Sequence, residues 1–167
     1  MKTIIRQYRP ADLPAMREIW NAVVNAGNAF PQSSPLSQAD AGAFFSGQSF
    51  SAVAECDGEI AGLYILHPTN IGRCGHLANA SYAVKETARG RRLGEALVRH
   101  SMETARELGF RVLQFNAVVS SNTPAIQLYR KLGFVELGTI PGGFRLDNGN
   151  WADITLFYHL LPEQQAQ

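Results

Sequence analysis

Two hydrophobic spacings alternate along the chain and divide it into helices and strands. Apolar residues that recur every three or four positions predict amphipathic helices at 10–27, 89–109 and 122–133, and a shorter helix is expected at 38–47. Short runs rich in β-branched and aromatic residues predict strands between the helices. These runs lie at 3–9, 50–56, 59–68, 75–84, 111–119, 134–141 and 151–161. The expected order of elements is β-α-α-β-β-β-α-β-α-β-β.

Turn and capping residues fit these boundaries. The pair Asp57-Gly58 stands between two successive strands and favours a two-residue hairpin, because both central positions take positive φ. Asn122 stands where a side chain can cap the last helix, and Asp12 is expected to cap the first. Leu108 is expected on the inner face of the long central helix.

The centre of the chain determines the sheet. Strand 75–84, helix 89–109 and strand 111–119 form a unit whose two strands run parallel through a right-handed crossover. The flanking hairpins make the remaining strands antiparallel. The sequence therefore predicts one α/β (α+β) domain over residues 1–161, followed by a polar tail at 162–167. Its sheet is mixed and mostly antiparallel, with a central parallel strand pair and helices on both faces.

Composition narrows the partners and the compartment. The chain has 167 residues, 46% hydrophobic and 17% charged, which fits an ordinary globular domain. A formal net charge of +1 leaves no electrostatic footprint for nucleic acid. No stretch approaches the roughly 18 apolar residues of a membrane span, and the N-terminal apolar run is too short for a signal peptide. Cys56 and Cys74 have no metal-ligand spacing, so we expect no metal and a cytoplasmic protein with reduced thiols.

The stretch ARGRRLGEAL, residues 88–97, joins the fourth strand to the long helix. Ligands of open α/β sheets bind at the carboxyl ends of strands, and a helix start offers unpaired N–H groups and partial positive charge. Gly90 and Gly94 let an anion approach the backbone, and Arg89, Arg91 and Arg92 can add charge-assisted bonds. The stretch is therefore either a phosphate or pyrophosphate site or a solvated helix start. Its spacing matches neither a dinucleotide fingerprint nor a P-loop.

From the fourth strand onward, the sequence resembles the GCN5-related N-acetyltransferases. The central motif of that family, R/Q-x-x-G-x-G/A, falls on residues 89–94, with Arg92 in place of the first glycine. A second motif, N-x-x-A-x-x-L-Y-x-x-x-G-F, matches at Asn122, Ala125, Leu128, Tyr129, Gly133 and Phe134. Two motifs at the proper separation are far more specific than either one alone.

The resemblance implies an acetyl-CoA-dependent N-acetyltransferase. Tyr129 would protonate the departing CoA thiolate, Asn122 would bond to the cofactor or orient the acceptor, and the pantetheine would run beside Val84. The cofactor pyrophosphate would lie on the amides of a segment that includes Arg89, Gly90, Arg91, Arg92, Gly94 and Glu95. From the residues alone, Tyr129 can instead be a core tyrosine and Asn122 only a helix cap.

Two asparagines in strands indicate where the acceptor binds. Asn79 and Asn116 stand in strands that would otherwise be apolar, although asparagine is disfavoured there and a buried amide needs partners. The wording HLANASY and FNAVVSSN is similar to a subgroup that includes fungal acetyltransferases of proline analogues such as azetidine-2-carboxylate. That similarity implies a small amino or imino acid acceptor, with its carboxylate on Asn79 or Asn116 and its nitrogen on Asn122. The asparagines can instead satisfy strand bulges or the backbone.

Other parts of the site are less determined. Phe30, in the loop after the first helix, and Phe144, in the last hairpin, are further acceptor-pocket candidates. Strict alternation places Asn116 on the same face as Val118. Glu55 and His76 are candidates for the general base, and we expect no single side chain to serve as the base.

Two other functions stay open at this stage. The acceptor can be a protein N-terminus or a lysine side chain, or the chain can be a non-catalytic acyl-CoA-binding regulatory module. A homodimer is expected, because most oligomers of soluble proteins are symmetric dimers.

Overall fold

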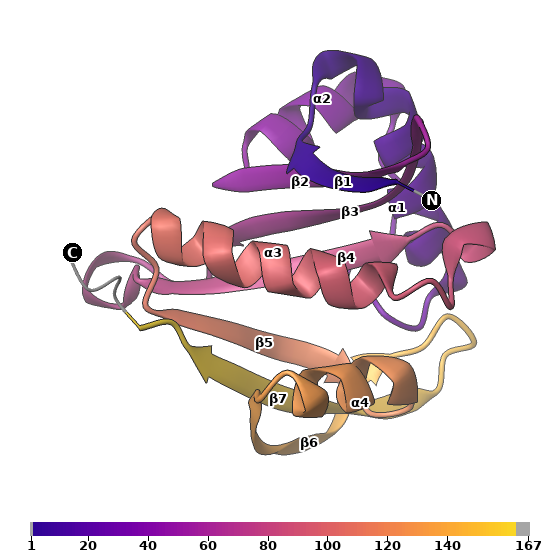
Figure 1. Ribbon diagram of the computed structural model, residues 1–167. Helices are drawn as coiled ribbons and strands as arrows, with labels where there is room; N and C mark the ends of the chain where they lie inside the picture. Colours follow the sequence, from indigo (N-terminus) through magenta and orange to yellow (C-terminus); the bar gives the residue numbers. More distant parts are fainter. Residues whose placement is uncertain (1, 163–167) are drawn as a thin grey trace.

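The computed structural model describes residues 2–162, which form a seven-stranded sheet in the order β1-β2-β3-β4-β5-β7-β6 (Figure 1). The strands are β1 (Thr3–Gln7), β2 (Phe50–Cys56), β3 (Glu59–Pro68), β4 (Leu77–Val84), β5 (Val112–Val119), β6 (Val135–Arg145) and β7 (Trp151–Leu160). The helices are α1 (Leu13–Ala26), α2 (Gln38–Ser46), α3 (Leu93–Glu107) and α4 (Thr123–Lys131), with 3-10 turns η1 (Pro10–Asp12), η2 (Gly72–Cys74) and η3 (Glu86–Ala88). Among these strands only β4 and β5 pair in parallel. The predicted fold class is confirmed; most of the predicted tail, 163–167, lies outside the described residues.

The helices cover both faces of the sheet, as expected. Figure 1 shows α3 and α4 in front of the sheet, with α1 behind it. On the α3 side, Leu97 and Val98 pack with strand residues such as Leu113, and all three are buried. On the opposite face, Trp20 of α1 packs with Phe45 of α2 and with Leu63 of β3. These two clusters hold the sheet between its helices.

Several predicted boundaries move. The long central helix begins at Leu93 rather than 89, because η3 and a left-handed residue, Arg92 (φ 57°), precede it. Leu108 was placed wrongly on its inner face: the helix ends at Glu107, and Leu108 is 49% exposed. β6 continues to Arg145 instead of ending at 141, because an irregularity in its pairing with β7 between Ile140 and Phe144 accommodates Pro141.

β4 and β5 are paired over only two positions. The parallel register joins Leu77 to Val112 and Ala78 to Leu113, near the start of each strand. Farther on, β5 shifts register against β7 between Phe115 and Val118, which marks a β-bulge. The two parallel strands therefore separate toward their carboxyl ends.

The bulge overturns one expectation about β5. Phe115 and Val118 pack in the same core cluster on the α3 side, although three positions separate them. Ala117 and Val119 belong to a different cluster, together with Phe144. Strict alternation therefore fails between Phe115 and Ala117, so the face of Asn116 no longer follows from alternation along β5.

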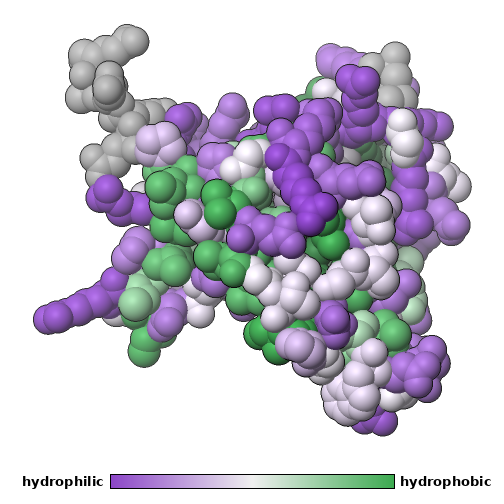
Figure 2. All heavy atoms as spheres, turned by 90° about the horizontal axis from the view of Figure 1, so that it is seen from below, coloured by the Kyte–Doolittle hydropathy of each residue, from purple (hydrophilic) through white to green (hydrophobic). Residues whose placement is uncertain are grey.

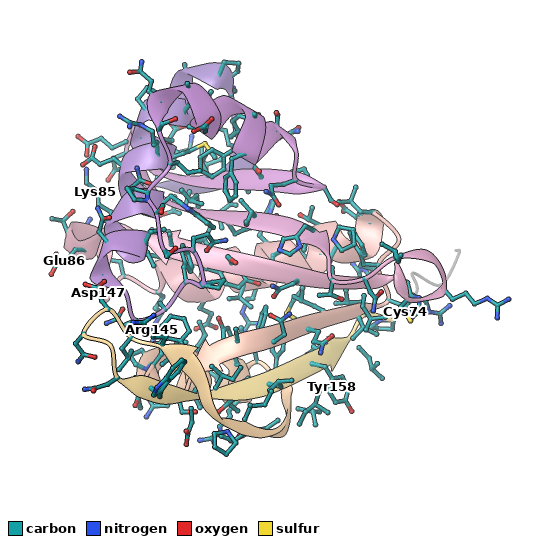
Figure 3. The ribbon with its side chains drawn as sticks, turned by 180° about the vertical axis from the view of Figure 1, so that it is seen from behind. Cys74, Lys85, Glu86, Arg145, Asp147 and Tyr158 are labelled. Carbon is teal, nitrogen blue, oxygen red and sulfur yellow. The ribbon has the colours of Figure 1, made fainter. Side chains whose placement is uncertain are left out.

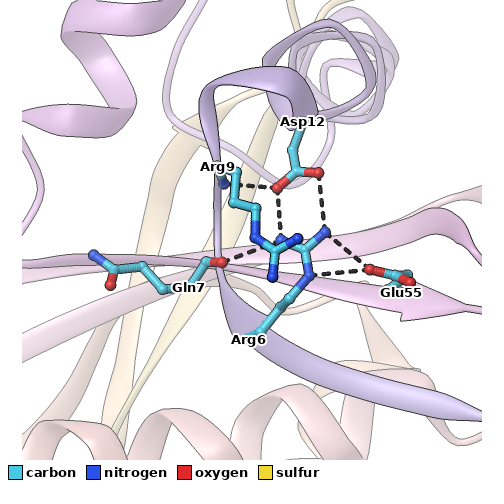
Figure 4. A network of polar contacts seen from close by, with 5 residues as sticks. All are labelled: Arg6, Gln7, Arg9, Asp12 and Glu55. Carbon is cyan, nitrogen blue, oxygen red and sulfur yellow. Dashed lines mark hydrogen bonds and ion pairs between the residues drawn. The ribbon is translucent and has the colours of Figure 1, made fainter.

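A network of charges fixes the N-terminal strand to its neighbours (Figure 4). The Arg6 guanidinium donates to Asp12 Oδ2 at 2.7 Å and to Glu55 Oε2 at 2.9 Å, and the Arg9 amide donates to Asp12 Oδ2 at 2.7 Å. The Asp12 side chain makes no capping bond to α1, contrary to expectation. The bond from Arg6 holds the pKa of the Asp12 carboxyl below its usual value.

Candidate active site

Two adjoining cavities lie at the carboxyl ends of β4 and β5. The larger has a volume of about 840 Å³ and extends from α1 across the end of β4 to the start of α4. The smaller, of about 320 Å³, lies between the separated strands. Ala29, Tyr82 and Asn122 line both cavities, so the two form one cleft.

The loop that enters α3 has free donors beside the larger cavity. Val84 and Arg89, two of the residues predicted to contact the cofactor, line this cavity. The first amide that donates into the helix is that of Ala96, to Arg92 O at 3.2 Å, so the amides of Leu93 and Gly94 have no partner within the helix.

The backbone of this loop is open to solvent at Gly90. A Cβ atom built on Gly90 (φ 78°) would meet nothing within 4 Å. The open backbone, the unpaired amides and the neighbouring arginines fit a pyrophosphate group.

Arg92 occupies the position where the family motif has glycine. The backbone conformation at this position accounts for the preference for glycine. Its φ of 57° lies in the left-handed region, which costs a residue with a Cβ roughly 1–2 kcal/mol. The side chain is exposed at the N-cap position of α3. The irregular residue therefore keeps the backbone shape of the motif at an energetic cost.

Arg92→Gly should raise the free energy of unfolding by about 1 kcal/mol, because it removes the left-handed strain. Urea denaturation measures this effect. Acetyl-CoA affinity should change less than about threefold, since the amide remains in place. Arg92→Ala keeps the strain and serves as the matched control. A tenfold loss of affinity in Arg92→Gly would instead assign the contact to the guanidinium.

The remaining cofactor candidates are placed differently. The Glu95 carboxylate accepts from Lys131 Nζ at 2.6 Å and from Arg99 Nη2 at 2.9 Å, and these bonds lower its pKa. Its side chain therefore ties α3 to α4, and only its amide is available to a phosphate.

Arg91 lines a separate cavity beside the β2–β3 turn, and Asp57 lines the same cavity. Lys85 and Glu86, at the mouth of the larger cavity, lie on the same side of the molecule as Arg145 and Asp147 (Figure 3).

Tyr129 projects from α4 into the smaller cavity. Its ring packs against Phe115, with ring centroids 4.4 Å apart, and against Phe134 and Phe157 at 5.6 Å. Burial raises the pKa of its hydroxyl well above the ordinary value. The hydroxyl is therefore protonated at neutral pH and can donate to an atom in the cleft.

The three predicted asparagines come together around the smaller cavity. Asn79 of β4, Asn116 at the β5 bulge and Asn122 at the start of α4 all line it, as does Phe30. Asn122 also caps α4 as predicted, because its Oδ1 accepts from the Ala125 amide at 3.4 Å. Phe144 lines neither cavity; it is buried in the cluster with Val119.

Neither predicted base candidate lies in the cleft. Glu55 is held by Arg6, and His76 is exposed before β4 and lines neither cavity. Sequence reasoning missed His67 and Gln32, which both line the smaller cavity. The pairing of β3 with β4 could have indicated His67, because His67 lies opposite Asn79 in that register.

The fold and the cleft define a transferase that takes its acyl group from a CoA thioester. A model of the acetyltransferase (GNAT) family matches residues 13–134, and the chain belongs to this family. It is an acetyl-CoA-dependent acetyltransferase. Among residues 2–162, no group of His, Cys, Asp and Glu could hold a metal ion, and no helix is long and apolar enough to cross a membrane.

Relatives with known names support this assignment. L-Methionine sulfoximine/L-methionine sulfone acetyltransferase of Pseudomonas aeruginosa is 31% identical over 99% of both chains. N-acetyltransferase aca1 of Schizosaccharomyces pombe is 27% identical over 62% of this chain, and the match spans only 50% of that relative. A phosphinothricin acetyltransferase from Sinorhizobium meliloti, solved with acetyl-CoA, is 25% identical, with a TM-score of 0.88 over 96% of this chain and 89% of the other.

Proposed function

We propose that the enzyme transfers the acetyl group to the amine of a small molecule, an amino or imino acid. The observation that carries this proposal is the lining of the smaller cavity, which combines three asparagines with Phe30 in about 320 Å³. Amides recognise a carboxylate and an amine through hydrogen bonds and need no counter-charge. The relative from P. aeruginosa is named for L-methionine sulfoximine and L-methionine sulfone, which are small amino acids.

Each residue of the cleft then has a role. Asn79 or Asn116 donates to the acceptor carboxylate, and Asn122 orients the nitrogen. Acetyl-CoA supplies the thioester carbonyl that the amine attacks. As the C–N bond forms and the C–S bond breaks, Tyr129 donates its proton to the sulfur. The amides at the start of α3, including those of Gly90, Arg91, Arg92, Gly94 and Glu95, hold the pyrophosphate, and Arg89 adds charge.

The two alternative functions predict different behaviour. A protein or peptide acceptor calls for an open groove with acidic walls, whereas no Asp or Glu is among the described residues that line the smaller cavity. A regulatory acyl-CoA-binding module would bind the cofactor without turnover on any amine. The small-molecule function is therefore preferred.

A thiol-release assay with acetyl-CoA tests the proposal across free amino acids, imino acids, polyamines and peptides. We expect turnover with amino or imino acids, including L-methionine sulfone. Asn116→Ala should lower kcat/KM by roughly 10- to 100-fold, because it removes a hydrogen bond to a charged group. Asn25→Ala, on an exposed position of α1 outside both cavities, is the control. Activity confined to peptides would overturn the small-acceptor function.

The proposal includes a cytoplasmic homodimer. The outer strand β6 supports the dimer, because Leu137 and Ile140 on it are 56% and 48% exposed, and Trp151 on β7 is 69% exposed. Figure 2, viewed from below, shows apolar side chains among hydrophilic ones on this side of the molecule. An exposed edge strand with apolar side chains is a surface on which a second copy can pair.

A further inference from the structure

An imidazole faces the acceptor side of the cleft, and nothing in the mechanism above uses it. His67 lines the smaller cavity near the end of β3. It lies directly opposite Asn79 in the antiparallel β3–β4 register, which is continuous through this pair. Residues directly opposite each other in such a pair project from the same face of the sheet. His67 therefore stands beside a proposed acceptor ligand.

The position of His67 on β3 shows from which face of the sheet its side chain projects. Leu63 and Ile65, at alternate positions before it, pack on the face covered by α1 and α2, where Phe30 also packs. Tyr129 and Phe115 belong to the cluster on the opposite face. The cleft between β4 and β5 thus has an imidazole on one side and the proposed thiolate donor on the other.

Hydrogen bonding fixes the state of this imidazole. His67 Nδ1 lies 2.9 Å from the carbonyl oxygen of Pro68. A carbonyl oxygen only accepts, so Nδ1 must carry the hydrogen. In the neutral ring, Nε2 then has a free lone pair. A neutral imidazole with a free Nε2 is equipped to take a proton.

No carboxylate is among the described residues that share the smaller cavity with His67. The other titratable side chains that line it are Tyr82 and Tyr129, and burial raises the pKa of both hydroxyls. No Asp, Glu, Lys or Arg is among its described lining residues. Tyr82 is further engaged with Ser101 Oγ at 2.7 Å.

We propose that His67 is the general base that takes a proton from the acceptor ammonium. This assignment rests on the proposed transfer to a small amine. His67 Nε2 accepts one proton from the ammonium, which frees the nitrogen lone pair. That nitrogen attacks the thioester carbonyl, the C–N bond forms, the C–S bond breaks, and the sulfur receives a proton from Tyr129. The second amine proton and the proton on His67 pass to water, which also restores Tyr129.

His67→Gln tests the assignment, with L-methionine sulfone as the acceptor probe. At pH 7 we expect kcat/KM to fall by about 10²-fold, a common contribution of a general base. The loss should shrink as pH rises, because the acceptor then arrives as a free amine and needs no base. Exogenous imidazole should partly restore His67→Ala. A loss of equal size at every pH, without rescue, would show that His67 only positions the acceptor and would overturn the assignment.

His159→Gln is the matched control. His159 Nδ1 likewise bonds to the carbonyl oxygen of the next residue, Leu160, at 2.6 Å, but His159 lines neither cavity. Its substitution should leave the pH–rate profile unchanged. Calorimetric titration with acetyl-CoA should give the same affinity for His67→Gln and wild type, which shows that the variant folds.

A measurement on the free protein gives a second readout. Nitrogen-15 NMR of the histidine rings should show His67 as the Nδ1–H tautomer when neutral. An Nε2–H tautomer would overturn the assignment without any assay. If wild type acetylates no amine of the panel, the proposed function falls and the base falls with it. If wild type is active and His67→Gln keeps the wild-type profile, only the base falls.

Discussion

Tyr129→Phe should lower kcat by about two to three orders of magnitude and leave acetyl-CoA affinity within about twofold of wild type. The phenol is the group we propose to protonate the departing sulfur, and its ring contacts with Phe115 and Phe134 survive the substitution. Steady-state kinetics by thiol release and calorimetric titration with acetyl-CoA measure the two quantities. The combination of lost turnover and retained binding is the signature of a proton donor.

The raised pKa of Tyr129 adds a pH expectation. An ordinary tyrosine loses its proton near pH 10. Burial raises the pKa of Tyr129, so its hydroxyl stays protonated above that pH and donation persists there. Tyr158→Phe, outside both cavities on β7, is the control and should retain full activity. Full activity of Tyr129→Phe would contradict the assigned role and favour a donor from solvent.

Asp12→Ala should lower the free energy of unfolding by about 2–3 kcal/mol at pH 7, measured by urea denaturation. The Asp12 side chain, 10% exposed, accepts from Arg6 and from the Arg9 amide. Its removal leaves the Arg6 guanidinium with the Glu55 carboxylate and the Gln7 carbonyl oxygen as acceptors. The ion pair of Arg130 and Glu136 is the control. This pair is also an arginine with a carboxylate, but the Arg130 side chain is 58% exposed and the Glu136 side chain 38%. Glu136→Ala should therefore lower the free energy of unfolding by less than about 1 kcal/mol.

The Asp12 network also has a defined pH dependence. Because the folded-state pKa of Asp12 is lowered, its contribution is fully present above the ordinary carboxyl pKa. The contribution is lost as pH falls through the folded-state value. The stability difference between wild type and Asp12→Ala should therefore narrow in acid. A difference that stays constant from neutral pH down to acid would contradict the ion-pair origin.

The sequence predicted those parts of the fold that depend on local signals. The Asp57-Gly58 turn is present, with both residues at positive φ, and Asn122 caps α4. Asparagines in otherwise apolar strands, together with the similarity to a subgroup, indicated Asn79 and Asn116, and both line the smaller cavity. Alternation, turn chemistry and motif spacing each involve short stretches of chain. They can therefore be recognised in the sequence before the three-dimensional structure is known.

The missed features depend on contacts between distant segments. His67 enters the cleft only through the β3–β4 register, and the loop of residues 69–76 does not fix that register. The β5 bulge interrupts the alternation of faces between Phe115 and Val118, and no local signal in the sequence marks it. Phe144 was predicted to line the acceptor pocket from the last hairpin, but β6 extends to Arg145 and Phe144 is buried in the cluster with Val119.

The short pairing of β4 with β5 gives the sheet an edge inside the molecule. Beyond Ala78, the β5-facing edge of β4 has no ladder in the parallel register. At the outside of a protein, such an edge would recruit another chain. Here it borders the cleft, so we expect the amides of the acetyl-CoA pantetheine chain to bond to it as a further strand would. The bound acetyl-CoA would then pair with β4 in place of a strand. Between turnovers this edge of β4 would have no such partner.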